Sequence, residues 1–230
     1  MSAATPERLH AAFRLILAER NEEALQELLW FREHADQSDP IIGGLRQSYA
    51  LIYWIRLADQ YPPARAALDE ARERALTRAL EGERAHLLDV ISIDHAQDQP
   101  LRTRDLLLQL EALHPALVAS CARAALPLVM QAGDAALAER LMPDPAQSIR
   151  QHGEYLMWAF QHHRRKYAAT ARIPAEIDNY VGDVNAILDV LCERGRHAEA
   201  QTLRTLAADI IPATTVRRAV RTALARVNRA

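Results

Sequence analysis

The stretch that most constrains the fold runs from Leu191 to Pro212. It reads Leu-Cys-Glu-Arg-Gly-Arg-His-Ala-Glu-Ala-Gln-Thr-Leu-Arg-Thr-Leu-Ala-Ala-Asp-Ile-Ile-Pro. Gly195 interrupts a pattern that is helical on both sides, and glycine suits the turn after a helix because it adopts a positive φ without strain. Pro212 ends the second pattern, since proline is excluded from helix interiors. The stretch therefore predicts two helices joined by a tight turn at Gly195, the second ending at Pro212.

Prolines punctuate the rest of the chain in the same way. Proline suits the first turn of a helix, because it lacks an N–H and clashes with a preceding turn. No Asn-Gly or Asp-Gly hairpin turn occurs, and we predict no strands. Cutting at the prolines and at Gly82, Gly133 and Gly195 gives about twelve helical segments, so we predict an all-α fold. Of the 11 prolines, ten fall where an apolar pattern stops or restarts: Pro6, Pro40, Pro62, Pro63, Pro100, Pro115, Pro143, Pro145, Pro174 and Pro212.

Two neighbouring segments differ in character. Pro62 to Glu81 is amphipathic, with alanine and leucine recurring every three to four residues and charged residues opposite. Leu45 to Tyr61 contains the run Tyr49 to Ile55, which is apolar all round. Because the pattern around that run is too long for a typical strand, we predict one buried helix from Leu45 to Tyr61. Buried helices with amphipathic helices outside them are typical of stacked helix pairs.

The Leu191 to Pro212 stretch resembles the second half of a tetratricopeptide repeat (TPR). The turn and small positions of that family are matched by Gly195, Ala200, Ala207 and Pro212. The stretch from Arg46 to Val90 also resembles bacterial TPR-like proteins. In each expected helix pair, a small residue lies near the start of the second helix. These residues are Ala24, Ala64, Thr103, Ala138 and Ala200, and their spacing is longer than the repeat length of the TPR family.

The resemblance implies a right-handed α-α superhelix, a TPR-like solenoid of about six helix pairs. Each pair has two apolar faces and can bury both only against its neighbours. We expect TPR-like repeats over residues 1–144 and a C-terminal helical region over residues 145–230 that continues the solenoid. A single domain over residues 1–230 is the alternative. The C-terminal region begins with an extra helix, predicted over about Ala146 to Tyr167.

Composition and charge argue against several classes of protein. Half of the residues are hydrophobic but only 5% are aromatic, which favours closely packed helices over a β-sandwich. The net charge of −2 argues against binding nucleic acid through bulk positive charge. No apolar stretch approaches the roughly 18 residues of a membrane span, and the N-terminus lacks a signal-peptide pattern. Cys121 and Cys192 are too few for a disulfide scaffold, so we expect a cytoplasmic protein.

The first helix of a TPR lines a concave groove, and the resemblance implies such a groove here. In that register one face of the Leu45 to Tyr61 helix presents Arg46, Tyr49, Tyr53 and Arg56. Tyrosine supplies rigid contact area, and arginine binds a carboxylate through two parallel hydrogen bonds. These side chains could hold a peptide terminus or an acidic side chain. The alternative is that the tyrosines are ordinary core and the arginines cap or solvate the helix.

The first helix of the next expected pair carries His86, Asp89, Asp94 and His95. A helical metal site needs ligands at i,i+3 or i,i+4, and only His86 with Asp89 has that spacing, so we expect no metal. Asp89 and His95 could instead add a polar patch to the groove beside Arg46 and Arg56. Ordinary hydrogen-bonded or exposed side chains are the alternative. An enzymatic site around Asp89 and Asp94 is a further hypothesis.

Basic residues gather in the C-terminal third. They comprise the run His162 to Lys166 and the residues Arg217, Arg218, Arg221, Arg226 and Arg229. Such residues bind phosphate groups in some helical-repeat proteins, but the helix dipole and the polar outer face of a terminal repeat also favour them. The alternative function is therefore a helical-repeat nucleic-acid binder or a base-processing enzyme.

Nothing in the sequence predicts a catalytic residue or a cofactor. Cys121 and Cys192 have no histidine at helical contact spacing, so buried small side chains are expected there. The usual phosphate loops, nucleophile motifs and metal motifs do not occur. We therefore predict a non-catalytic scaffold or adaptor that binds a protein or peptide partner in its groove. The predicted groove residues are Arg46, Tyr49, Tyr53, Arg56, Asp89 and His95.

Overall fold

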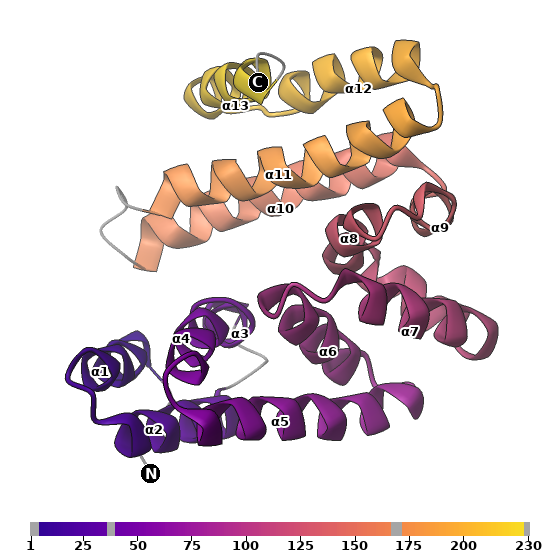
Figure 1. Ribbon diagram of the computed structural model, residues 1–230. Coiled ribbons are helices and arrows are strands. Elements are labelled where there is room, and N and C mark those ends of the chain that lie inside the picture. The colour runs from indigo at the N-terminus through magenta and orange to yellow at the C-terminus, as the bar shows by residue number, and fades with distance from the viewer. Residues whose placement is uncertain (1–4, 36–39, 167–171, 228–230) are drawn as a thin grey trace. The chain divides into compact units, whose positions relative to one another are not determined.

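The computed structural model describes residues 5–35, 40–166 and 172–227 (Figure 1). Those residues form helices joined by turns and include no β-strand, which confirms the all-α prediction for them. The first helices of the chain are α1 (Pro6–Leu17), α2 (Asn21–His34), α3 (Pro40–Gln47), α4 (Tyr49–Ala58), α5 (Pro62–Leu80), α6 (Arg84–Ala96), α7 (Pro100–Leu113) and α8 (Pro115–Gln131). The later ones are α9 (Ala135–Leu141), α10 (Pro145–Lys166), α11 (Arg172–Glu193), α12 (His197–Asp209) and α13 (Thr214–Val227).

The chain forms two compact units, Met1–Leu128 and Val129–Ala230, and the division falls within α8. The boundary expected from sequence followed residue 144. The reason for the earlier division is that α9 packs on α11, so it belongs to the second unit. Glu139 of α9 binds Arg194 at 2.9 Å and Arg196 at 3.0 Å, which ties α9 to the turn between α11 and α12.

One hydrophobic cluster of the first unit lies between α1, α2, α4 and α5 and includes Ile93 of α6. Its largest fully buried side chain is Trp54, whose indole N–H donates to the carbonyl of Ala64 at 2.9 Å. That bond connects α4 to the first turn of α5. Helix α5 buries the apolar stripe that its amphipathic pattern predicts, Ala64, Leu68, Ala71, Ala75 and Ala79, and it also buries Arg72.

In the second unit, α11 packs against α10, α12 and α13. Figure 1 shows α10 and α11 side by side and antiparallel, with α12 beyond α11. The predicted extra helix corresponds to α10. Tyr180 of α11 is buried and donates its hydroxyl to the carbonyl of Ala207 at 2.8 Å. Burial raises the pKa of that phenol, so Tyr180 stays a neutral donor inside the unit.

The turn predicted at Gly195 is confirmed, and its geometry recurs. Gly195 has a φ of 72°, its N–H donates to the carbonyl of Cys192, and the N–H of Arg196 donates to the carbonyl of Leu191. This bonding is the Schellman pattern that closes a helix C-terminus. The same two bonds surround four other residues with positive φ: Glu19, Gly82, Asp98 and Gly133. The backbone thus repeats a turn even where the sequence lacks glycine.

The small residue five positions after several of these turns is buried. Ala24, Thr103 and Ala138 are fully buried, and Ala200 is 4% exposed. A small side chain there lets the following helix approach its neighbours closely. Each of these residues lies in the first turns of its helix, in α2, α7, α9 and α12.

The helix predicted from Leu45 to Tyr61 is neither continuous nor buried all round, since Tyr49 is 53% and Ile52 57% exposed. Helix α3 ends at Gln47, α4 begins at Tyr49, and Ser48 between them has φ −129° and ψ −89°. The Ser48 hydroxyl donates to the carbonyl of Gly44 at 2.6 Å, which replaces a helical backbone contact at this point. The break separates Arg46 from Tyr49, Tyr53 and Arg56, so these four side chains do not share one helix face.

Among the described residues, no helix combines the length and the apolar character that crossing a membrane requires.

Candidate binding surfaces

Helix α6 carries two buried carboxylates, and the first of them is Asp89. Asp89 is 2% exposed and receives two hydrogen bonds from the Arg46 guanidinium, one of them 2.7 Å from Nη2 to Oδ2. Arg32 of α2 lies 3.3 Å from the same carboxylate. Burial lowers the pKa of Arg32 to about 10, while Asp89 opposes that shift. Asp89 therefore joins α2, α3 and α6.

The second carboxylate, Asp94, is fully buried on the opposite side of α6. It accepts hydrogen bonds from Arg72 at 2.5 and 3.0 Å and from the Thr103 hydroxyl at 3.0 Å. The hydrogen bond to Asp94 raises the pKa of Arg72. Asp94 therefore joins α5, α6 and α7. Its oxygens are occupied by protein donors, which gives the hypothesis of an enzymatic site at Asp89 and Asp94 no support.

These contacts change the interpretation of three predicted groove residues. Arg46 and Asp89 are brought together, but they are buried against each other and do not lie on an open groove. The sequence could not show this, because the two residues are far apart in the chain and lie on different helices. His95 is exposed on α6, away from that pair. His86 contacts Glu83 at 2.9 Å through its Nδ1.

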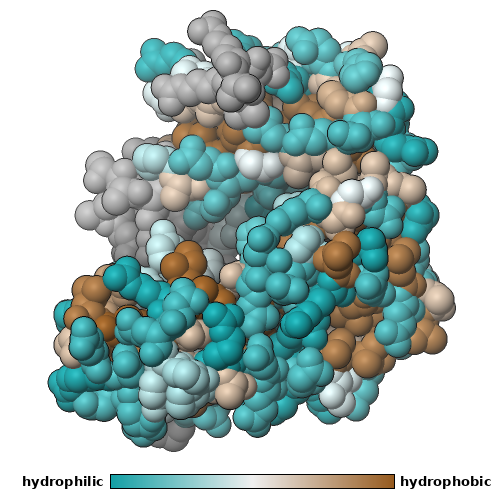
Figure 2. Space-filling view, viewed as in Figure 1, coloured by the Kyte–Doolittle hydropathy of each residue, from teal (hydrophilic) through white to brown (hydrophobic). Residues whose placement is uncertain are grey.

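The other three predicted residues lie on a surface formed by α1 and α4. We call it the α1–α4 surface, and it consists of Phe13, Arg14, Leu17, Tyr49, Ile52, Tyr53 and Arg56. The α4 members follow the spacing i, i+3, i+4, i+7, which places them on one helix face. Leu17 and Ile52 are each 57% exposed and Tyr49 is 53% exposed. Figure 2 shows hydrophobic surface over the α1 and α4 region, at the lower left.

Aromatic contacts hold this surface in a fixed arrangement. The rings of Phe13 and Tyr53 stack with centroids 4.6 Å apart, and Tyr49 meets Tyr53 edge-on at 6.5 Å. The Arg56 guanidinium carbon lies 5.4 Å from the Phe13 ring centroid. Stacked rings have few accessible rotamers, so this surface would lose little side-chain entropy when a partner binds.

The charge of the α1–α4 surface is positive. Arg14 and Arg56 are both exposed, and neither has an acidic partner among the described residues. The nearby acid Asp59 binds Arg65 at 3.1 Å instead. The surface therefore combines exposed apolar side chains with two guanidinium groups that are free to bind a carboxylate.

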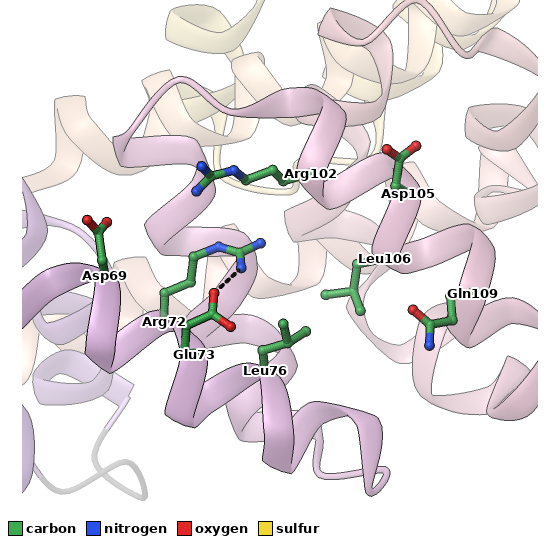
Figure 3. Close-up of a pocket in the computed structure, with 8 residues that line it drawn as sticks. All are labelled: Asp69, Arg72, Glu73, Leu76, Arg102, Asp105, Leu106 and Gln109. Carbon is green, nitrogen blue, oxygen red and sulfur yellow. Dashed lines mark hydrogen bonds and ion pairs between the residues drawn. The ribbon is translucent and has the colours of Figure 1, made fainter.

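A pocket of about 520 Å³ lies between α5 and α7 (Figure 3). Each helix contributes residues at i, i+3, i+4 and i+7, so one face of each helix lines the pocket. None of the six predicted groove residues takes part. The lining residues, which define the α5–α7 pocket, are Asp69, Arg72, Glu73, Leu76, Arg102, Asp105, Leu106 and Gln109.

The charged groups of the α5–α7 pocket differ in how far they are already paired. Arg72 is held by Asp94 and also donates to Glu73 at 3.0 Å. Asp69 accepts from the Gln97 amide at 2.9 Å, and Asp105 binds Arg104. The side chain of Arg102 forms no hydrogen bond or ion pair with the described residues. The pocket therefore has one unengaged guanidinium among three carboxylates.

The remaining candidates provide no site. Cys121 is buried, as expected, and burial raises the pKa of its thiol. Cys192 is exposed, so the expectation of a buried side chain there was wrong. Within the described ranges, no group of His, Cys, Asp and Glu side chains could hold a metal ion.

The basic C-terminal residues are partly engaged within the protein. Arg217 donates to the carbonyls of Ile211 and Pro212, and Arg221 binds Asp209 at 2.5 Å. Arg218 is exposed. The side chains from His162 to Lys166, that of Arg226, and Arg229 lie outside the described residues. Nucleic-acid binding by this region stays a prediction.

No protein family model matches this chain, and no curated protein or solved structure matches it either.

Proposed function

We propose that this chain is a non-catalytic binding protein built from TPR-like helix pairs. Its α1–α4 surface would dock a segment of another protein that carries apolar side chains and acidic residues. The observation that carries the proposal is the exposed cluster of Tyr49, Ile52 and Leu17 beside two arginines without acidic partners.

The apolar part of this surface can supply the affinity. Fully burying a large apolar side chain is worth about 1.5–3 kcal/mol. Leu17, Tyr49 and Ile52 are each more than half exposed, so each can still bury much of its area against a partner. Aromatic residues are enriched at the anchoring positions of interfaces, and Tyr49 is already oriented by its contact with Tyr53.

The charge of the surface selects the partner. Arg14 and Arg56 would each leave water to contact a partner, and a carboxylate is the group that best matches a guanidinium. Opposite charges also increase the rate of association and disfavour basic partners. A segment with apolar side chains spaced on one helical face and flanked by Asp or Glu would satisfy both parts of the surface.

Two observations support the arrangement as stacked helix pairs. Five helices end in the same Schellman turn, and a small buried residue follows four of these turns at the same spacing. Proteins built in this way bind other molecules on extended surfaces. The chain described here would use the α1–α4 surface for that purpose.

The test is selection from a random peptide library displayed on phage, with the whole chain immobilised. We expect the enriched peptides to combine acidic residues with Leu, Phe, Trp or Tyr. Synthetic versions of the enriched peptides should bind the wild-type chain and lose at least about tenfold in affinity with Tyr49→Ala or Arg56→Glu. The matched control is Arg218→Glu, which makes the same charge change at an exposed arginine of the second unit.

Enriched peptides that are basic, or that bind Tyr49→Ala and Arg56→Glu as tightly as the wild type, would contradict the proposal. Circular dichroism and thermal unfolding would show that each variant remains folded. Both substitutions are at exposed side chains, so the unfolding temperature should change little.

A further inference from the structure

The α5–α7 pocket is a second site on the first unit, and it shares no residue with the α1–α4 surface. We propose that it binds a short zwitterionic peptide whose side chains are apolar. The pocket volume of about 520 Å³ lies in the range of sites for small ligands. The inference goes beyond the proposed function, because the ligand is a small molecule and the site lies on other helices.

The carboxylate of the peptide would bind Arg102. This guanidinium lines the pocket and has no partner among the described residues, so its donors are available. A guanidinium and a carboxylate form two parallel charge-assisted hydrogen bonds. Arg72 cannot take this role, because its guanidinium already donates to Asp94 and Glu73. Asp94 in turn also accepts a hydrogen bond from Thr103.

The ammonium group of the peptide would bind between Asp69 and Glu73. Figure 3 shows Asp69, Arg72 and Arg102 at one end of the pocket, with Glu73 beside Arg72. Each carboxylate accepts one side-chain hydrogen bond, from Gln97 or from Arg72. An ionised carboxylate has about four acceptor positions, so both can accept further bonds. This end of the pocket can therefore hold both charges of a zwitterion.

The apolar side chains of the peptide would lie at the other end. Leu76 of α5 and Leu106 of α7 lie there in Figure 3, together with Gln109 and with Asp105, whose carboxylate is paired with Arg104. The amide of Gln109 can donate to and accept from a peptide bond. A ligand with a charged head and an apolar body thus matches the order of groups along the two helices.

The wall of the pocket is held rigid before a ligand arrives. Arg72 is fixed by a fully buried carboxylate, and Thr103 of α7 bonds to the same carboxylate. The two walls are therefore connected through Asp94 of α6. Rigid walls lower the entropy lost on binding.

The test uses the whole chain and the dipeptide Leu-Leu, with binding measured by isothermal titration calorimetry. Two blocked forms, N-acetyl-Leu-Leu and Leu-Leu amide, remove one charge each. We expect Leu-Leu to bind and each blocked form to bind about threefold to fivefold more weakly, the loss of one solvent-exposed ion pair. Arg102→Gln should weaken Leu-Leu by a similar factor and abolish the discrimination against Leu-Leu amide. Glu73→Gln should reduce the discrimination against N-acetyl-Leu-Leu.

The matched control is Arg78→Gln, at an exposed arginine of α5 outside the pocket, which should bind all three peptides as the wild type does. Saturable binding that is equal for Leu-Leu and both blocked forms would overturn the proposal. So would wild-type binding that is too weak to saturate, or an Arg102→Gln variant that still discriminates against the amide. Failure of this test leaves the peptide selection on the α1–α4 surface unaffected, because Arg102 and Glu73 are not part of that surface.

Discussion

Replacing Asp94 by alanine should destabilise the first unit strongly. Asp94 is fully buried and accepts two hydrogen bonds from Arg72 and one from Thr103. The Asp94→Ala change leaves the Arg72 guanidinium, itself 7% exposed, without its counter-ion, and leaves the Thr103 hydroxyl without its acceptor. The cost arises mainly from the groups left behind rather than from the aspartate removed.

The size of the effect follows from the contacts. Removing one partner of a buried ion pair costs about 3–5 kcal/mol. Arg72 keeps the exposed carboxylate of Glu73 at 3.0 Å, which partly compensates, so we expect about 3 kcal/mol. Domains are stable by only about 5–15 kcal/mol, so this loss is a large part of the total. The double variant Arg72→Met with Asp94→Leu removes both charges and should be much less destabilised than Asp94→Ala alone.

Urea unfolding followed by tryptophan fluorescence measures the effect. Trp30 and Trp54 lie in the first unit and Trp158 in the second, so a Trp158→Phe background makes the signal report on the first unit. The control is Asp105→Ala, which breaks an exposed pair with Arg104 and should cost less than about 1 kcal/mol. A loss below about 1 kcal/mol for Asp94→Ala, or a double variant less stable than either single one, would refute the reasoning.

Two further predictions concern the second unit. Gly182→Ala should raise the unfolding free energy by about 0.5–1 kcal/mol, because alanine favours a helix and a Cβ there meets no atom within 4 Å. Gly153→Ala should gain less, since its Cβ would lie 2.9 Å from the end of the Ile210 side chain; a larger gain at Gly153 in urea unfolding would contradict the packing of α10 on α12. Asp189→Asn should raise the unfolding temperature at neutral pH. Partial desolvation raises the pKa of Asp189, an exposed residue of α11, while Arg204 opposes the shift. The ionised form therefore costs a little stability at neutral pH, and that cost disappears as the pH falls below the ordinary value of 3.8. A gain that persists in acid, or a loss at neutral pH, would show that the charge is not the cause.

The sequence predicted the local structure of much of this chain, because local rules determine it. Proline and glycine restrict φ strongly, so the helix starts and the turn at Gly195 could be placed without tertiary information. The small buried positions followed from the spacing after each turn. The turns at Glu19 and Asp98 were harder, because a non-glycine residue adopts positive φ only where the surrounding structure compensates for its strain.

The candidate site residues could be predicted only in part. Helical periodicity places Tyr49, Tyr53 and Arg56 on one face of α4, so the sequence could group these three residues. The contact between Arg46 and Asp89 depends on how α3 packs against α6, which no local pattern encodes. The α5–α7 pocket has a signal in the sequence, the i, i+3, i+4, i+7 spacing of polar residues on both helices. That spacing also describes an ordinary solvated helix face, so it became informative only once the two faces were seen to line one cavity.

The arginines of the first unit show why contacts, rather than composition, must assign function. Arg46 and Arg72 are buried with carboxylates of α6, so their charges are used to hold helices together. Arg14, Arg56 and Arg102 have no such partner among the described residues, and they lie on the two surfaces for which binding is proposed. The groove predicted from sequence combined Arg46, which is buried with a carboxylate, and Arg56, which has no acidic partner among the described residues. The two would share a face if Leu45 to Tyr61 were one helix. The break at Ser48 separates them, and it leaves Arg56 as the member of the pair that is free to meet a partner.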